Sequence, residues 1–148
     1  LPGQAITREW LLDMTATTYS FATVTEMTGE TIKTVLEDVA DNLFNPDPYY
    51  QQGGDMVRVG GLTYSCNPVA KAGQRIGDMR LKGQLIEAGK KYKVAGWAPV
   101  AEEARNQGNK QVWEVVETWL KAQGGRIKPR QLNTPKIMGA LPNKGYAV

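Results

Sequence analysis

One amphipathic segment, ended by two prolines, restricts the fold of this sequence more than any other feature. Apolar residues recur from residue 32 to 44 at the three- and four-residue spacing of one helical face. The polar positions between them include Lys33, Glu37, Asp38 and Asp41. Thr28 is placed to cap the helix, and Pro46 and Pro48 disfavour helical backbone beyond about Asn45. We therefore expect a helix with one face buried in a core.

Strand patterns flank this helix on both sides. Alternating or β-branched residues predict strands over 18–27, 56–66, 75–81 and 91–97. Gly60-Gly61 predicts either a bulge or a close backbone approach in the second of these strands. Lys82-Gly83-Gln84 predicts a turn after the third, and the last three strands together suggest a meander. Further helices are expected at 8–14 and 112–120. This order predicts an α+β fold, a mixed or antiparallel sheet covered by helices.

Several residues are expected to have structural roles only. Trp113 and Trp119 fall on the apolar stripe of the later helix and are predicted to be core residues. Cys66 is predicted to be a small buried residue at a strand end. Asp38 and Asp41 share a helix face opposite the apolar stripe, so both are expected to be solvated.

The absence of histidine limits the chemistry of the chain. Its 148 residues contain no His and one Cys, so the commonest general base, the commonest metal ligand and any internal disulfide are missing. Paired glycines occur, but none lies in a phosphate-loop or dinucleotide-binding pattern. A self-contained hydrolase is therefore not expected, and no run of apolar residues is long enough to span a membrane.

Basic charge gathers at the end of the chain. Residues 1–117 hold twelve Lys/Arg and fifteen Asp/Glu, whereas residues 118–148 hold six Lys/Arg and no acid. We expect a domain over 1–123 and a basic, extended tail over 124–148, packed on the domain or trailing from it. The tail has one aromatic, Tyr146, so nucleic acid is not an expected partner. An acidic protein surface remains an open possibility for it.

A loop over 45–55 is the strongest candidate for binding. It combines two prolines, two tyrosines, two glutamines and a glycine pair, and exposed aromatic clusters tend to mark interfaces. Trp97 closes a strand and opens a polar loop, where an aromatic can either line a cleft or fill the core.

Residues 41–66, which read DNLFNPDPYYQQGGDMVRVGGLTYSC, resemble the SoxB thiosulfohydrolases of bacterial sulfur oxidation. Residues 1–7 and 92–98 resemble the start and a later strand of the same C-terminal domain. More broadly, the chain resembles the C-terminal domain of 5′-nucleotidases. The resemblance implies that domain's mixed sheet covered by helices.

The resemblance also implies a function for the parent protein. SoxB-like enzymes are periplasmic hydrolases that release sulfate from a cysteine S-thiosulfonate on the SoxYZ carrier during thiosulfate oxidation. Their two manganese ions bind in an N-terminal metallophosphoesterase-like domain, so this chain is expected to have no catalytic residue, no metal ligand and no activity alone. The implied substrate-binding residues are Tyr49, Tyr50, Gln52, Gly53, Gly54, Asp55, Met56 and Trp97.

Departures from the nucleotidase pattern bear on the substrate. Nucleotidases hold the base between two aromatics, but here Gly53-Gly54 is followed by Asp55-Met56, and Trp97 has no glycine-rich run after it. The arginine that the SoxB family uses near the substrate is expected upstream of Leu1. The alternatives left open are a 5′-nucleotidase-type phosphoesterase domain and a carrier-binding interaction module.

Overall fold

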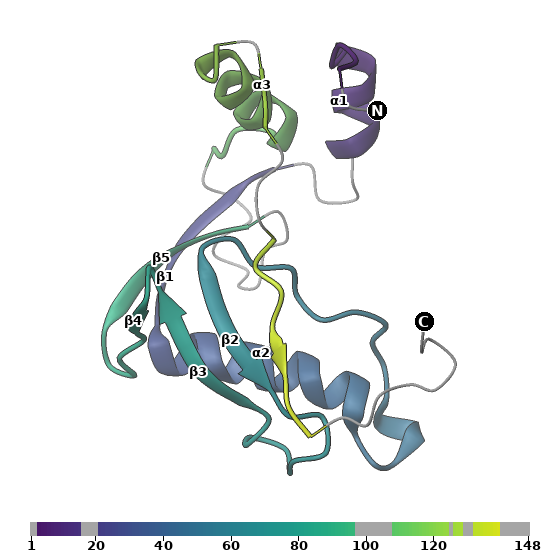
Figure 1. Cartoon of the computed structure of the whole chain (residues 1–148), viewed down its shortest axis with the longest axis vertical. Helices are drawn as coiled ribbons and strands as arrows, with labels where there is room; N and C mark the ends of the chain where they lie inside the picture. The colour runs from purple at the N-terminus through teal and green to yellow at the C-terminus, as the bar shows by residue number, and fades with distance from the viewer. Residues whose placement is uncertain (1–2, 16–20, 97–107, 125, 129–131, 140–148) are drawn as a thin grey trace. The chain divides into compact units, whose positions relative to one another are not determined.

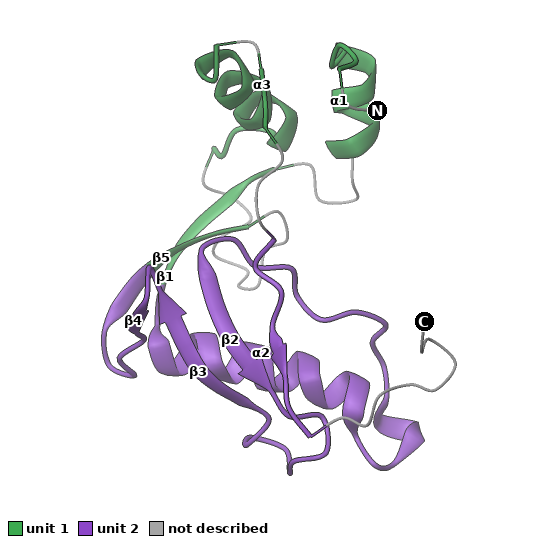
Figure 2. Ribbon diagram, in the orientation of Figure 1, with its two compact units in different colours: residues 1–26, 93–130 green, residues 27–92, 131–148 purple. Residues whose placement is uncertain are grey.

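The computed structural model describes residues 3–15, 21–96, 108–124, 126–128 and 132–139. The chain divides into two compact units, shown in Figure 2. Unit 1 comprises residues 1–26 and 93–130, and unit 2 comprises residues 27–92 and 131–148. Strands β1 (Thr23–Thr28) and β5 (Lys91–Gly96) pair in a two-stranded sheet, and each contributes residues to both units.

The long helix of unit 2, α2 (Gly29–Phe44), begins and ends where the sequence predicts. Thr28 is the N-cap, with extended φ −71° and ψ 158°, and its Oγ1 accepts a hydrogen bond from the Thr31 N–H at 3.1 Å. The helix ends before Asn45, in agreement with the prolines that follow. Its apolar stripe buries Leu36 and Ala40.

A four-stranded mixed sheet packs against α2 (Figure 1). Its members are β2 (Leu62–Cys66), β3 (Ile76–Leu81), β4 (Gln84–Leu85) and β6 (Lys136–Ile137), in the order β4-β3-β2-β6. β2 is antiparallel to β3 and parallel to β6. Lys82 (φ 51°) and Gly83 (φ 81°) form the predicted turn between β3 and β4. The α+β class expected from the sequence is therefore confirmed.

Two strand predictions are wrong in detail. The strand expected over 56–66 is a regular strand only from Leu62, because Gly61 has φ 85° and turns the backbone; the segment before it makes one isolated bridge, Val59 to Asn133. The strand expected over 91–97 is not the third strand of a meander. The two-residue β4 takes that place beside β3, and β5 pairs with β1.

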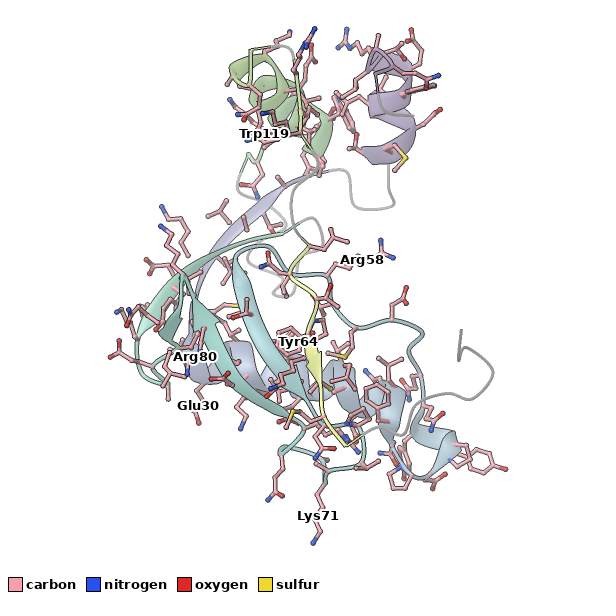
Figure 3. All side chains as sticks on the ribbon, viewed as in Figure 1. Glu30, Arg58, Tyr64, Lys71, Arg80 and Trp119 are labelled. Atoms are coloured by element: carbon pink, nitrogen blue, oxygen red, sulfur yellow. The ribbon has the colours of Figure 1, made fainter. Side chains whose placement is uncertain are left out.

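The core of unit 2 gathers between α2 and the sheet. It consists of Leu36, Ala40, Tyr64, Cys66 and Ile76, and Tyr64 is labelled in Figure 3. Cys66 is completely buried at the end of β2, which confirms the prediction for this residue.

A buried carboxylate joins α2 to the sheet. Glu37 is 7% exposed, and its two oxygens accept hydrogen bonds from the backbone N–H groups of Arg75 (3.1 Å) and Ile76 (2.8 Å). The sequence pattern assigned Glu37 to the polar face of the helix. Its burial is explained by these two backbone donors, which start β3 and would otherwise lie in the core without acceptors.

Unit 1 contains two short helices that contact each other. They are α1 (Arg8–Thr15), capped by the Thr7 hydroxyl, and α3 (Val112–Ala122), which begins with a capping box. The prediction that Trp113 and Trp119 are core residues is wrong: Trp113 is half-buried and Trp119 is 38% exposed. The helix α1 buries one side chain, Leu11, and α3 buries none, so the contact between these helices does not enclose the two rings.

Gly29 tests the packing of the first turn of α2. A Cβ at this position would lie 2.3 Å from the backbone oxygen of Glu87, so Gly29→Ala must displace backbone. We expect this clash to outweigh the better helix propensity of alanine and to lower the free energy of unfolding by about 1–3 kcal/mol. Urea unfolding monitored by circular dichroism measures the change. Gly89→Ala is the control, because a Cβ there meets nothing within 4 Å; equal stability of both variants would contradict the packing.

Candidate functional site

The loop that follows α2 contains most of the predicted binding residues. Residues 49, 50 and 52–56 are all described and lie in one continuous segment between α2 and β2. Trp97, the eighth predicted residue, lies outside the described residues. The structure therefore defines a candidate site on residues 45–59, which we call the tyrosine loop.

A short 3₁₀ helix, η1 (Pro48–Tyr50), shapes the start of this loop. Asp47 caps it: Asp47 Oδ1 accepts a hydrogen bond from the Tyr49 N–H at 3.0 Å, and the Asp47 carbonyl accepts one from the Tyr50 N–H at 3.1 Å. Pro48 occupies the first turn, where its fixed φ is favourable and no donor is lost. Both tyrosines therefore project from a hydrogen-bonded turn.

The two tyrosines of η1 are exposed although their backbone is ordered by hydrogen bonds. Tyr49 is 91% exposed and Tyr50 is 62% exposed. Aromatic rings with polar tips bury large areas at little cost in side-chain entropy, which makes them effective contact residues. The exposed pair is thus a surface suited to binding a partner or a substrate.

The glycine pair brings the loop back to the end of the helix. The Gly53 N–H donates to the Asn42 carbonyl at 3.3 Å, and a Cβ on Gly53 would lie 3.3 Å from the Asn42 Cβ. A larger residue at position 53 would push the loop away from α2. Gly54 has open space around it, so the same argument does not apply there.

A shallow hollow of about 250 Å³ lies at the end of the tyrosine loop. Its walls are residues 56–59 and residues 132–135. Met56, the last predicted residue of the loop, lines this hollow and also packs against the core. Arg58, labelled in Figure 3, is exposed on the same wall.

The second wall of the hollow was not foreseen from the sequence. The Asn133 Oδ1 accepts a hydrogen bond from the Gly61 N–H at 2.9 Å, and Val59 and Asn133 form a bridge. Leu132 beside it is 83% exposed. Residues 132–135 lack a strong periodic signal, and only their long-range pairing with residues 59–61 places them here.

A buried arginine contacts the end of α2, where the tyrosine loop begins. The Arg75 side chain is 2% exposed, and its guanidinium donates to Asp41 Oδ1 at 2.5 Å and to the Phe44 carbonyl at 3.2 Å. The prediction of a solvated carboxylate is right for Asp38 and wrong for Asp41, because Asp41 is the counter-ion of this arginine. The hydrogen bond from Arg75 lowers the pKa of Asp41, and a hydrogen bond from Asn45 adds to this effect.

The most deeply buried ionisable groups of the core strand β2 are not activated. Burial raises the pKa of both the Cys66 thiol and the Tyr64 phenol, so neither is activated as a nucleophile. In the part of the chain that the structure describes, no group of three or more His, Cys, Asp or Glu could hold a metal ion. Nor does any helix there have the length and apolar character needed to cross a membrane.

Comparisons with known proteins agree with this picture. The family profile described as 5′-nucleotidase, C-terminal domain, matches residues 1–108. The structure matches that of a sulfate thiohydrolase SoxB from Thermus thermophilus, solved with glycerol, at 34% identity and a TM-score of 0.79. A Staphylococcus aureus protein assigned as a 5′-nucleotidase, solved with alpha-ketoglutarate, shares the fold at 14% identity and a TM-score of 0.58. No match was found among curated proteins.

The matched region is a minor part of each neighbour. The SoxB match covers 97% of this chain but 27% of that chain, and the nucleotidase match covers 89% of this chain and 30% of that chain. The expected resemblance to a SoxB-like C-terminal domain is confirmed, and most of each neighbour's length lies outside it.

Asp41 gives a pH-dependent prediction. Its pKa is below the ordinary value of 3.8 when folded, so the stability from its charge is complete above pH 3.8 and is lost as the pH falls through the folded pKa. We expect Asp41→Asn to be less stable than the wild type near neutral pH, with the difference narrowing below about pH 4. Urea unfolding from pH 7 to pH 2.5 measures this. A constant difference across that range, or the same behaviour from the exposed control Asp38→Asn, would contradict the assignment.

Proposed function

Because the chain belongs to the 5′-nucleotidase C-terminal domain family, we propose that it is the substrate-guiding domain of a SoxB-type thiosulfohydrolase. The parent enzyme hydrolyses a cysteine S-thiosulfonate on the SoxYZ carrier and releases sulfate in the periplasm. The observation that carries this proposal is the tyrosine loop, an ordered segment with two exposed rings, in a chain 34% identical to a SoxB structure.

The side chains of the loop suit a modified peptide arm. In this proposal, the ring faces of Tyr49 and Tyr50 cover the apolar atoms of the arm, and their hydroxyls donate hydrogen bonds to sulfonate oxygens. Met56 supplies a flexible apolar contact at the hollow. These residues bind and orient the substrate and exclude water, and none of them takes part in bond cleavage.

The metal belongs to another part of the parent protein. The whole chain has no histidine, and the described residues contain no cluster of possible ligands, so the residues present do not fit a manganese site. We therefore assign the two manganese ions and the hydrolytic step to an N-terminal metallophosphoesterase-like domain.

A nucleotide is the second candidate substrate. The family match and the Staphylococcus aureus neighbour favour a 5′-nucleotidase-type phosphoesterase. A base would need an aromatic ring on each of its faces, and the residues that line the described hollow, 56–59 and 132–135, include no aromatic side chain. The carrier-bound sulfonate is therefore the preferred substrate.

The division of labour is tested with the isolated chain. With manganese and SoxYZ bearing the cysteine S-thiosulfonate, we expect no sulfate release, because the chain has no histidine and its described residues hold no cluster of metal ligands that could activate water. The enzyme that contains this chain should release sulfate under the same conditions. Ion chromatography measures the sulfate. Turnover by the isolated chain would overturn the proposal, and hydrolysis of AMP but not of the carrier substrate by the whole enzyme would favour the nucleotidase alternative.

Replacing Tyr50 by alanine in the whole enzyme tests the binding surface. We expect the KM for the carrier-bound substrate to rise about tenfold, which corresponds to the loss of about 1.4 kcal/mol of binding free energy at an aromatic contact residue. Steady-state sulfate release measures KM and kcat. Leu85→Ala is the matched control, a comparably exposed apolar side chain on β4. Equal KM values for the two variants would remove Tyr50 from the substrate site.

A further inference from the structure

Asn45 lies where α2 ends and the tyrosine loop begins, and each of its polar groups is hydrogen-bonded. Its backbone N–H donates to the Asp41 carbonyl (3.0 Å), and its Nδ2 donates to Asp41 Oδ2 (2.8 Å). Its Oδ1 accepts from the Asp47 N–H (3.0 Å), and its backbone oxygen accepts from Gln51 Nε2 (2.7 Å). Asn45 therefore connects the last turn of the helix to both ends of the 3₁₀ turn.

The inner side of this connection is anchored in the core. Asp41 uses one carboxylate oxygen for Asn45 and the other for the guanidinium of Arg75, whose side chain is 2% exposed. Arg75 is itself fixed, since its backbone N–H donates to the buried Glu37. Hydrogen bonds to both of its oxygens thus fix the position of the Asp41 carboxylate.

The outer side of this connection reaches the tyrosines. The backbone of Asp47 is held by Asn45, and the Asp47 carboxylate and carbonyl accept the N–H groups of Tyr49 and Tyr50. A continuous series of hydrogen bonds therefore runs from a buried arginine to the backbone N–H groups of Tyr49 and Tyr50, two residues that are 91% and 62% exposed.

We infer that Asn45 is a positioning residue, which sets the placement of Tyr49 and Tyr50 relative to the Arg75–Asp41 ion pair. The inference rests on the proposed function only for the statement that the two tyrosines meet the substrate. The geometry of the hydrogen bonds carries the positioning role.

The variant Asn45→Asp tests whether Asn45 positions the loop or only ends the helix. The variant keeps the side-chain shape and the Oδ1 acceptor, but it places a second carboxylate oxygen against Asp41 Oδ2, where the amide donates at 2.8 Å. Arg75 keeps Asp41 ionised, so the new carboxyl is the one whose pKa rises. Among the described residues, the other charged groups hydrogen-bonded along the series are the carboxylates of Glu37 and Asp47. Below its raised pKa, the new carboxyl can donate a proton to Asp41 as the amide does.

Amide hydrogen exchange of the 148-residue chain at pH 5 and pH 8 is the first measurement. At pH 8 we expect Asn45→Asp to lower the protection factors of Tyr49, Tyr50 and Gly53 about tenfold, with recovery toward wild-type values at pH 5. Asn45→Ala should lower them at both pH values. Asp38→Asn, an exposed change on the same helix, should leave them unchanged.

Unchanged protection in both Asn45 variants would overturn the inference. Loss of protection in β2 to the same extent as in the loop would also overturn it, because the role would then be general stability.

The second measurement is the KM and kcat of the whole enzyme for the carrier-bound substrate. A several-fold higher KM for Asn45→Asp, reversed on acidification relative to the wild type, with kcat within about twofold, supports both the positioning role and the proposed function. If the loop loses protection but KM is unchanged, Asn45 still positions the loop, and the proposed substrate contact of the tyrosines is wrong. The two failures are therefore distinguishable.

Discussion

The hydrogen bonds of the buried Glu37 carboxylate are the interaction on which the arrangement of unit 2 depends. A carboxylate in a core is costly unless its oxygens are satisfied, and here each oxygen accepts a backbone N–H at the start of β3. The same two donors would cost about 1–3 kcal/mol each if left without acceptors. The helix carboxylate and the two backbone donors beside the sheet thus satisfy each other, and the guanidinium of Arg75 pairs with Asp41 on the same helix.

This arrangement gives the surface loop a rigid base. The backbone of Arg75 is held by Glu37, and its guanidinium donates a hydrogen bond to Asp41. Asp41 lies one helical turn after Glu37 on α2. The end of α2 therefore contacts the buried Arg75 guanidinium on one side and continues into the loop with the exposed Tyr49 and Tyr50 on the other. A binding surface built in this way has less conformational freedom to lose when it meets a partner, which lowers the entropic cost of association.

Local patterns in the sequence were sufficient for elements whose signals are local. The periodicity of residues 32–44, the capping hydroxyl of Thr28 and the turn at Lys82-Gly83 all appear in the structure where they were expected. Local patterns could not predict which strands pair over long distances in the sequence. β5 pairs with β1, and β6 pairs with β2, and a short stretch of sequence does not specify either partner. Glu37 and Asp41 were misassigned for the same reason, since their partners lie more than thirty residues away.

In the candidate site, too, the part with a local signal was predicted and the part that depends on long-range contacts was not. The tyrosine loop was identifiable because its composition is unusual for a connection, whereas the wall formed by residues 132–135 depends on contacts across some seventy residues. The family resemblance rested on a continuous run of residues and was confirmed. The eight binding residues derived from it remain a prediction.

The short strand β6 has a consequence for biosynthesis. It pairs with the side of β2 that β3 leaves open, and it follows β2 by some seventy residues in the sequence. A ribosome completes residues 62–66 long before residues 136–137, so during translation that edge of the sheet has no neighbour. Open edges of this kind recruit strands from other molecules. Pairing with β6 therefore covers an edge of β2 that would otherwise be open to strands of other molecules.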